Sequence, residues 1–190
     1  MFDDYQPKET TGRTVAREIC DWVESAITAM ICVVLLFTFV ARISDVDGVS
    51  MQPTLEDQDR LVITRLGLGP SHGDIVVVTL PGRESEPLVK RVIATEGDTV
   101  DINFETGQVF VNGVQLYEPY LKETTRLRYN MTFPQVVPEG RVFILGDNRN
   151  NSWDSRDLRV GMVDSRHILG RAIYRVFPYQ RMGIPCPHTS

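Results

Sequence analysis

One serine that could do chemistry stands in the stretch DGVSMQPTL, from Asp47 to Leu55. Ser50 lies between a valine and a methionine, shortly before Pro53 and shortly after a long apolar run. A serine in this setting suits a turn, a helix cap or a nucleophile. Because a serine nucleophile needs a base and groups that stabilise negative charge, the rest of the chain must supply both.

Histidine is the usual base for a serine, but the three histidines (His72, His167 and His188) lie in contexts that favour surface positions. Lysine is the other candidate. Lys90 stands in LVKRVIAT, a run that predicts a β-strand. Neighbouring strand residues point to opposite faces, so either Lys90 or Arg91 is expected to face inward.

Two interpretations of Lys90 stay open from the residues alone. An exposed lysine on an edge strand discourages aggregation, and the run by itself favours this interpretation. A lysine buried among apolar groups loses its proton more readily, because desolvation disfavours the charged form. Such a neutral lysine accepts the proton of a serine hydroxyl, which is the Ser-Lys variant of nucleophilic catalysis.

A third stretch, GDNRNNSWDSRDL, runs from Gly146 to Leu158 and follows an apolar run at Arg141–Leu145. Its density of polar side chains indicates a turn held by its own hydrogen bonds. The same density suits a polar network that positions a catalytic group, and the two interpretations are compatible.

An apolar run precedes these stretches. Seventeen residues without a charge, from Ser25 to Ala41, lie between Glu24 and Arg42. Their length and polarity predict a transmembrane anchor over residues 25–43, within a helix that begins near Thr14. A buried core helix and a cleavable signal peptide are the alternatives. The second is disfavoured, because residues 1–24 are not basic and no A-x-A follows the run.

The rest of the chain is predicted to be mainly β, as one antiparallel barrel or sandwich-like domain over residues 44–178. An N-terminal segment (1–24) and the anchor precede this domain, and a loose tail (179–190) follows it. Val109–Leu116 predicts a hairpin around Asn112-Gly113, and residues 117–140 predict an irregular excursion. Further strands are expected at 60–64, 74–80, 88–95, 99–104, 141–145 and 168–177.

The composition excludes some functions. A net charge of −5 argues against a nucleic-acid partner, which requires basic patches. The three cysteines, Cys20, Cys32 and Cys186, form no CxxC or Cys/His cluster, so we expect free thiols and no zinc. We expect no cofactor and no metal.

In this order the three stretches resemble the bacterial type I signal peptidases, which are membrane-bound Ser-Lys enzymes. The family's SMxPTL motif matches Ser50–Leu55, its KR motif matches Lys90-Arg91, and its GDNRxNSxDSR motif matches Gly146–Arg156. A GDIVV segment, also typical of the family, begins at Gly73. One predicted anchor and no large insertion resemble the compact, Gram-positive-like branch.

The resemblance implies roles for individual residues. Ser50 would be the nucleophile, Lys90 the neutral general base, and Ser152 a hydrogen-bond partner that orients the lysine amine. Asp154 and Arg156 would form an ion pair. The other implied supporting residues are Asp147, Arg149 and Arg91.

The resemblance also implies an oxyanion hole, with the Ser50 N–H as one donor. Some members carry a serine two residues before the nucleophile as the second donor. This chain has Gly48 there, so a backbone N–H or water must replace the hydroxyl. Proximity in sequence to the implied catalytic residues suggests the substrate-pocket walls, which are Val46, Met51, Leu55 and Val89.

The implied function is removal of signal peptides from translocated preproteins after small residues, as in A-x-A. Residues 1–24 would be cytoplasmic and the catalytic domain extracytoplasmic, at the plasma membrane. The implied partners are preproteins and the lipid bilayer, and the enzyme is expected to be a monomer. The alternatives are a specialised Ser-Lys peptidase for one pilus or conjugation protein, and a non-catalytic assembly chaperone. A self-cleaving LexA-like regulator is a further alternative, but such a protein should carry a DNA-binding module instead of a membrane anchor.

Overall fold

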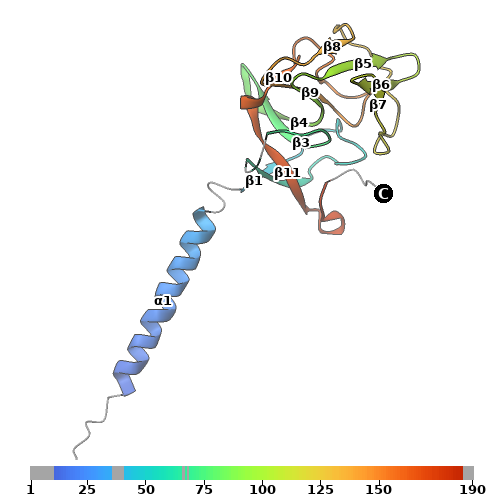
Figure 1. Cartoon of the computed structure of the whole chain (residues 1–190). Helices are drawn as coiled ribbons and strands as arrows, with labels where there is room; N and C mark the ends of the chain where they lie inside the picture. Colours follow the sequence, from blue (N-terminus) through green and yellow to red (C-terminus); the bar gives the residue numbers. More distant parts are fainter. Residues whose placement is uncertain (1–10, 36–40, 66, 68, 186–190) are drawn as a thin grey trace, which may run out of the picture. The chain divides into compact units, whose positions relative to one another are not determined.

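The computed structural model of the chain describes residues 11–35, 41–65, 67 and 69–185 (Figure 1). The chain divides into two compact units, residues 1–40 and residues 41–190. In the described part of the first unit lies the helix α1 (Thr11–Leu35), which begins slightly before the expected start at Thr14. Many apolar side chains of α1 are exposed, among them Ile19, Trp22, Ile27 and Met30.

Among the described residues, no helix has both the length and the apolar character needed to cross a membrane. The anchor predicted over residues 25–43 includes residues 36–40, which lie outside the described part of the chain. Its last three residues were assigned wrongly, because the chain from Ala41 onward forms the first strand of the second unit.

The second unit is built from two antiparallel sheets, which confirms the mainly β prediction. The larger sheet has seven strands in the order β1-β2-β11-β3-β4-β9-β10. Their bounds are β1 (Ala41–Asp45), β2 (Arg60–Thr64), β11 (Ile168–Phe177), β3 (Ile75–Leu80), β4 (Arg83–Thr95), β9 (Arg141–Leu145) and β10 (Val163–Asp164).

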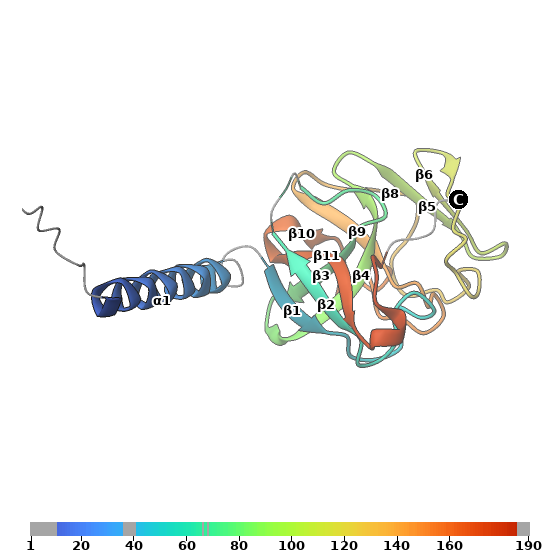
Figure 2. The same cartoon turned by 90° about the horizontal axis from the view of Figure 1, so that it is seen from below.

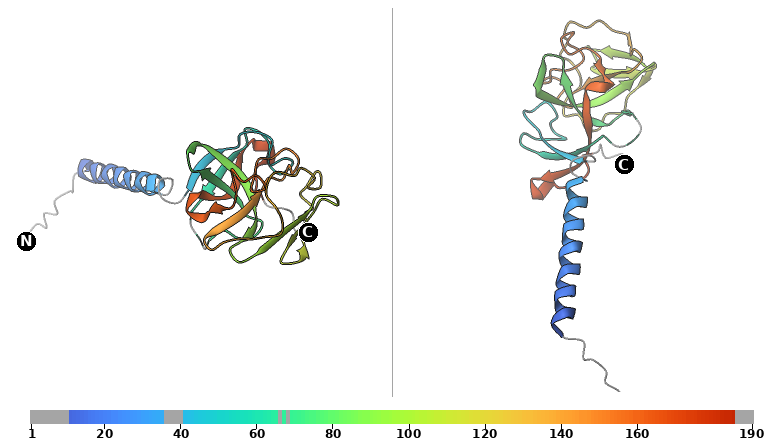
Figure 3. Two further views of the ribbon diagram at one scale, coloured as in Figure 1. Left: turned by 90° about the horizontal axis from the view of Figure 1, so that it is seen from above. Right: turned by 90° about the vertical axis from the view of Figure 1, so that its left-hand side faces the viewer.

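The smaller sheet has the order β7-β6-β5-β8 and lies at the end of the unit away from β1 and β2 (Figures 1, 2 and 3). Its strands are β7 (Val114–Gln115), β6 (Gln108–Val111), β5 (Thr99–Asn103) and β8 (Gln135–Val136). Asn112 and Gly113 both have positive φ, as the type I′ turn expected between β6 and β7 requires.

The central strands of the larger sheet are covered on both faces, and this decides where their polar side chains go. Ile75 and Val77 of β3 pack into one apolar cluster, while Val76 and Val78 pack into another. A strand buried on both faces loses the alternation of inward and outward residues. This explains why β4, which lies between β3 and β9, buries consecutive residues.

The C-terminal segment differs from the loose tail expected after residue 178. A short 3₁₀-helix, η3 (Tyr179–Arg181), follows β11, and Gly183 then pairs with Arg175 by two backbone hydrogen bonds. For residues 179–183 the expectation was wrong, because Arg181 pairs with charged side chains that lie far away in sequence. A second 3₁₀-helix, η2 (Ser165–His167), precedes β11.

Candidate active site

The loop that carries Ser50 joins β1 to β2. Backbone hydrogen bonds hold its two ends together: Val46 N–H donates to Asp59 O and Gln58 N–H donates to Val46 O, both at 2.8 Å. Within the loop, Met51 and Leu55 are buried in the apolar cluster beneath β2. The loop is therefore anchored by its own apolar side chains, while Ser50 stays partly accessible.

The four side chains expected to line a substrate pocket, Val46, Met51, Leu55 and Val89, all belong to this buried cluster. Met51 and Leu55 are 1% and 0% exposed and pack in the core. Val46 also borders a cavity of about 460 Å³. A role of these four side chains in a substrate pocket stays a prediction.

Lys90 lies beside Ser50 although forty residues separate them in sequence. Its Nζ donates to Ser50 Oγ at 2.7 Å and to Val89 O at 3.0 Å. Lys90 is 2% exposed and Arg91 is 0% exposed, so both are buried. The edge-strand interpretation of Lys90 is thus wrong, because β4 is a central strand.

The surroundings of Lys90 lower its pKa. Burial removes water from the ammonium group and lowers the pKa to about 8, while the carboxylates of Asp154 and Asp147 oppose this effect. The guanidinium of Arg156 acts in the same direction as burial. The neutral amine is consequently far more populated near neutral pH than in an exposed lysine.

Arg91 and Asp147 form a buried, bidentate ion pair with distances of 2.8 Å and 2.6 Å. Asp147 also accepts a hydrogen bond from Thr54 Oγ1 at 2.5 Å. Arg91 donates to Gly73 O at 2.8 Å, and its guanidinium lies over the ring of Tyr120. This pair connects β4, the Ser50 loop and the loop Gly146–Leu158, called the polar loop below.

Asp154 and Arg156 form the second buried pair, with two hydrogen bonds of 2.8 Å and 2.9 Å. Asp154 also accepts from the Gly146 N–H at 3.1 Å, and Arg156 donates to Arg149 O at 2.6 Å. The pair therefore connects the first part of this loop, at Gly146 and Arg149, to its later part. Arg149 donates from Nε to Gly146 O at 3.0 Å within this loop, and it also pairs with Glu118, in the segment expected to be irregular.

Asn148 is a residue whose role the sequence did not reveal. Its backbone N–H donates to Ser50 O at 2.9 Å, and its side-chain amide donates to Val49 O at 3.1 Å. These bonds hold the backbone on both sides of the Ser50 N–H. Its place in the GDNR motif was the only available signal.

The predicted hydrogen bond between Ser152 and Lys90 is absent. Ser152 is buried, and within the described residues its Oγ has no hydrogen-bond partner, because Lys90 donates to Ser50 and Val89 instead. Ser152 is nevertheless close to the site. A Cβ placed on Gly146 would collide with both Ser152 Oγ and Ser50 O, so only a glycine fits between them.

Gly48 does not offer the expected oxyanion donor, because its N–H already donates to Asp57 Oδ1 at 2.7 Å. Its φ of +89° suits glycine and would strain other residues. The Ser50 N–H, by contrast, is available as an oxyanion donor, since it donates to no acceptor in the described part of the chain.

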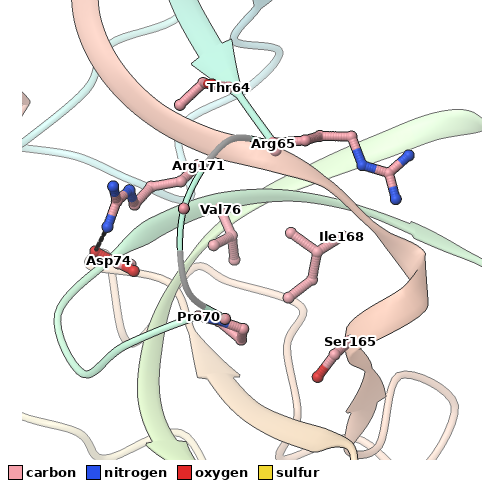
Figure 4. Close-up of a pocket in the computed structure, with 11 residues that line it drawn as sticks. Thr64, Arg65, Pro70, Asp74, Val76, Ser165, Ile168 and Arg171 are labelled. Atoms are coloured by element: carbon pink, nitrogen blue, oxygen red, sulfur yellow. Dashed lines mark ion pairs between the residues drawn. The ribbon is translucent and has the colours of Figure 1, made fainter. Parts of the chain in front are cut away.

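A separate pocket lies between the end of β2 and β11 (Figure 4). Its volume is about 170 Å³, and Arg171 and Asp74 form an ion pair at its wall. None of the predicted site residues lines it. The described residues contain no group of three or more His, Cys, Asp or Glu placed to hold a metal ion.

A serine hydroxyl that contacts a buried amine, with an adjacent unpaired N–H, has the geometry of an activated nucleophile with one oxyanion donor. Comparison with known proteins decides the family. The model of the family described as "Signal peptidase, peptidase S26" matches residues 19–177. The chain belongs to this signal peptidase family. It is therefore an enzyme, a serine peptidase that removes signal peptides.

Relatives in the family match over most of the chain. Signal peptidase I of Bacillus amyloliquefaciens is 35% identical over 185 residues, covering 92% of this chain and 96% of that protein. The probable signal peptidase I-1 of a Synechocystis strain is 40% identical over 166 residues, covering 82% and 81%. Signal peptidase I T of Bacillus subtilis is 33% identical over 185 residues, covering 92% and 93%. These names do not favour the specialised peptidase or the assembly chaperone.

Proposed function

We propose that Ser50 is the nucleophile of this signal peptidase and that Lys90 is its general base. The observation that carries this proposal is the 2.7 Å contact between Lys90 Nζ and Ser50 Oγ. The burial that lowers the lysine pKa to about 8 supports it, because a general base must be neutral in a useful fraction of molecules.

In the proposed reaction, Ser50 Oγ attacks the scissile carbonyl carbon while its proton passes to Lys90 Nζ. The Lys90 ammonium then gives this proton to the leaving amine, and an ester to Ser50 remains. A water molecule attacks the ester as Lys90 takes a proton from it, and the proton returns to Ser50 Oγ when the ester breaks.

The Ser50 N–H is the proposed oxyanion donor, because Asn148 holds the neighbouring carbonyls and leaves this N–H unpaired among the described residues. One such donor lowers the barrier by about 3 kcal/mol in serine peptidases of other families. The second donor is not Gly48 while Asp57 occupies its N–H, so water or another backbone group takes this place.

The proposed substrates are preproteins that present an extended segment with small residues at two positions, as in A-x-A. An extended segment adds backbone hydrogen bonds at a sheet edge, and the side chains on one face set specificity. Small pockets accept alanine and reject bulky residues by steric overlap. Ser152, Asp154, Arg156, Asp147 and Arg91 are proposed to support the site.

We also propose that the apolar run beginning at Ser25 anchors the enzyme in the plasma membrane, with residues 1–24 cytoplasmic and the β-rich unit extracytoplasmic. The exposed apolar side chains of α1 support this. A second observation comes from the outer face of the larger sheet, where Ile43 and Tyr174 are exposed neighbours across β2. Apolar and tyrosine side chains of this kind suit the bilayer interface.

A monomer is sufficient for the proposed chemistry, because one chain supplies both Ser50 and Lys90. We propose that the catalytic domain extends beyond residue 178, since Arg181 and Gly183 contact the sheet and its loops.

The test is cleavage of a labelled secretory preprotein by the detergent-solubilised, full-length enzyme. We expect one cut after the second small residue of an A-x-A sequence. Replacing that last alanine by phenylalanine should lower kcat/KM by at least about a hundredfold, because a bulky residue overlaps the walls of a small pocket. Equal cleavage of both substrates would contradict the proposed specificity.

A further inference from the structure

Two arginines of the C-terminal segment reach the loop that carries Ser50. Arg175 of β11 donates from Nη1 to Asp59 Oδ2 at 3.0 Å. Arg181 of η3 donates from Nη2 to Asp59 Oδ1 at 3.1 Å. Both carboxylate oxygens of Asp59 therefore have an arginine partner more than one hundred residues away in sequence.

Asp59 is 0% exposed, whereas its two partners remain partly accessible. A buried carboxylate requires charged or hydrogen-bonded partners, because desolvation without them is costly. Asp59 also accepts from the Glu56 N–H at 3.0 Å. The carboxylate thus connects the end of the Ser50 loop to the C-terminal segment.

The same arginines hold two further points of the loop. Arg175 Nη1 donates to Thr54 O at 3.1 Å, and Arg181 Nη1 pairs with Glu56 Oε1 at 2.5 Å. The two arginines are also connected to each other, because Arg175 Nε donates to Arg181 O at 2.5 Å. The C-terminal segment therefore holds the loop at Thr54, Glu56 and Asp59.

Thr54 receives restraints from two directions. Its hydroxyl donates to Asp147, the partner of Arg91 next to Lys90, and its carbonyl accepts from Arg175. Residues 50–55 are short and compact, since Leu55 N–H donates to Met51 O. We therefore expect a displacement at Thr54 to move Ser50 as well.

We propose that Arg175 and Arg181 are positioning residues, which fix the Ser50 loop through Asp59 and Thr54 so that Ser50 Oγ stays in contact with Lys90. This inference rests on the proposed role of Ser50 as the nucleophile. It assigns the segment 175–183 to the catalytic machinery, although none of its side chains contacts Ser50 or Lys90 in the described structure.

The test compares Arg181→Gln, Asp59→Asn and the double variant in the full-length enzyme, with the active-site concentration determined by burst titration. We expect each single variant to lower kcat by on the order of tenfold, with KM changed less than twofold, because small displacements of a nucleophile slow the chemical step. The double variant should be no slower than the slower single variant, since both remove one connection. Arg181→Lys should restore part of kcat.

The matched control is Arg166→Gln, which removes an exposed arginine paired with Asp164. This variant should keep the wild-type kcat. If Arg181→Gln lowers the melting temperature but leaves kcat per titrated active site unchanged, the segment is only structural and the inference is wrong. Ser50→Ala in the same assay distinguishes failure of this inference from failure of the proposed function, because an active Ser50→Ala enzyme would overturn the proposed nucleophile itself.

Discussion

The Ser50→Ala variant is expected to cleave secretory preproteins at least about a thousandfold more slowly than the wild-type enzyme, because loss of a serine nucleophile removes the covalent route. No other hydroxyl in the described structure forms a hydrogen bond with Lys90. Ser50 is half-buried and its side chain fills no core position, so folding should be unaffected. The measurement is the rate of precursor disappearance on a gel, together with the thermal unfolding curve.

Ser71→Ala is the matched control, since Ser71 is an exposed serine in a turn before β3. It should process the precursor at the wild-type rate. A folded Ser50→Ala enzyme that processes the precursor as fast as this control would show that another residue is the nucleophile.

The Lys90→Met variant should lose activity to a similar extent and should nevertheless unfold at a higher temperature near pH 7. A buried lysine whose pKa is lowered to about 8 destabilises the folded state when it is protonated. The gap between about 8 and 10.5 corresponds to about 3 kcal/mol. Methionine removes this cost, and the lost hydrogen bonds offset about 1–2 kcal/mol of the gain.

The pH dependence of this stabilisation has a definite sign. Above pH 10.5 the lysine is neutral in both the folded and the unfolded chain, so burial of its charge costs nothing. As the pH falls from 10.5 to about 8, the unfolded chain binds a proton that the folded chain does not, and the wild-type enzyme loses stability relative to Lys90→Met. The difference in melting temperature should therefore be larger at pH 6 than at pH 10.

Lys122→Met provides the control, because Lys122 is exposed and should show no such dependence on pH. A Lys90→Met enzyme that is less stable than the wild type at every pH would contradict the account of Lys90 as a buried, destabilised cation.

The sequence predicted the components of the site better than their contacts. Ser50, Lys90 and the GDNR loop were recognised as separate motifs, and the structure brings all three together. The wrong details have physical causes. Ser152 was assigned to Lys90, but the lysine amine bonds to Ser50 Oγ and the carbonyl of Val89, and the Ser152 hydroxyl has no hydrogen-bond partner among the described residues.

Alternation along β4 predicted that one of the pair Lys90 and Arg91 would face inward, and both are buried. The reason is that β4 is a central strand of the larger sheet and is covered on both faces. This position depends on the strand order and cannot be predicted from the sequence of one strand. The first three residues of β1, Ala41 to Ile43, were assigned to the membrane helix for a related reason. Apolar residues next to a long apolar run give no signal for the strand that will pair with them.

The C-terminal segment shows even more clearly that contacts between distant residues cannot be predicted from the local sequence. Its composition, with prolines and a glycine, is typical of a loose end. Arg175 and Arg181 hold it because Asp59 is buried more than one hundred residues earlier, and a single sequence does not show such a pairing.

The most direct test of the central claim, that a neutral Lys90 activates Ser50, is the pH dependence of kcat/KM for preprotein cleavage between pH 6 and pH 10. We expect kcat/KM to rise about tenfold per pH unit below about 8 and to reach a plateau above it, because the slope reports one group that must lose a proton. A rate that is constant over this range, or that falls through pH 8, would contradict Lys90 as the general base.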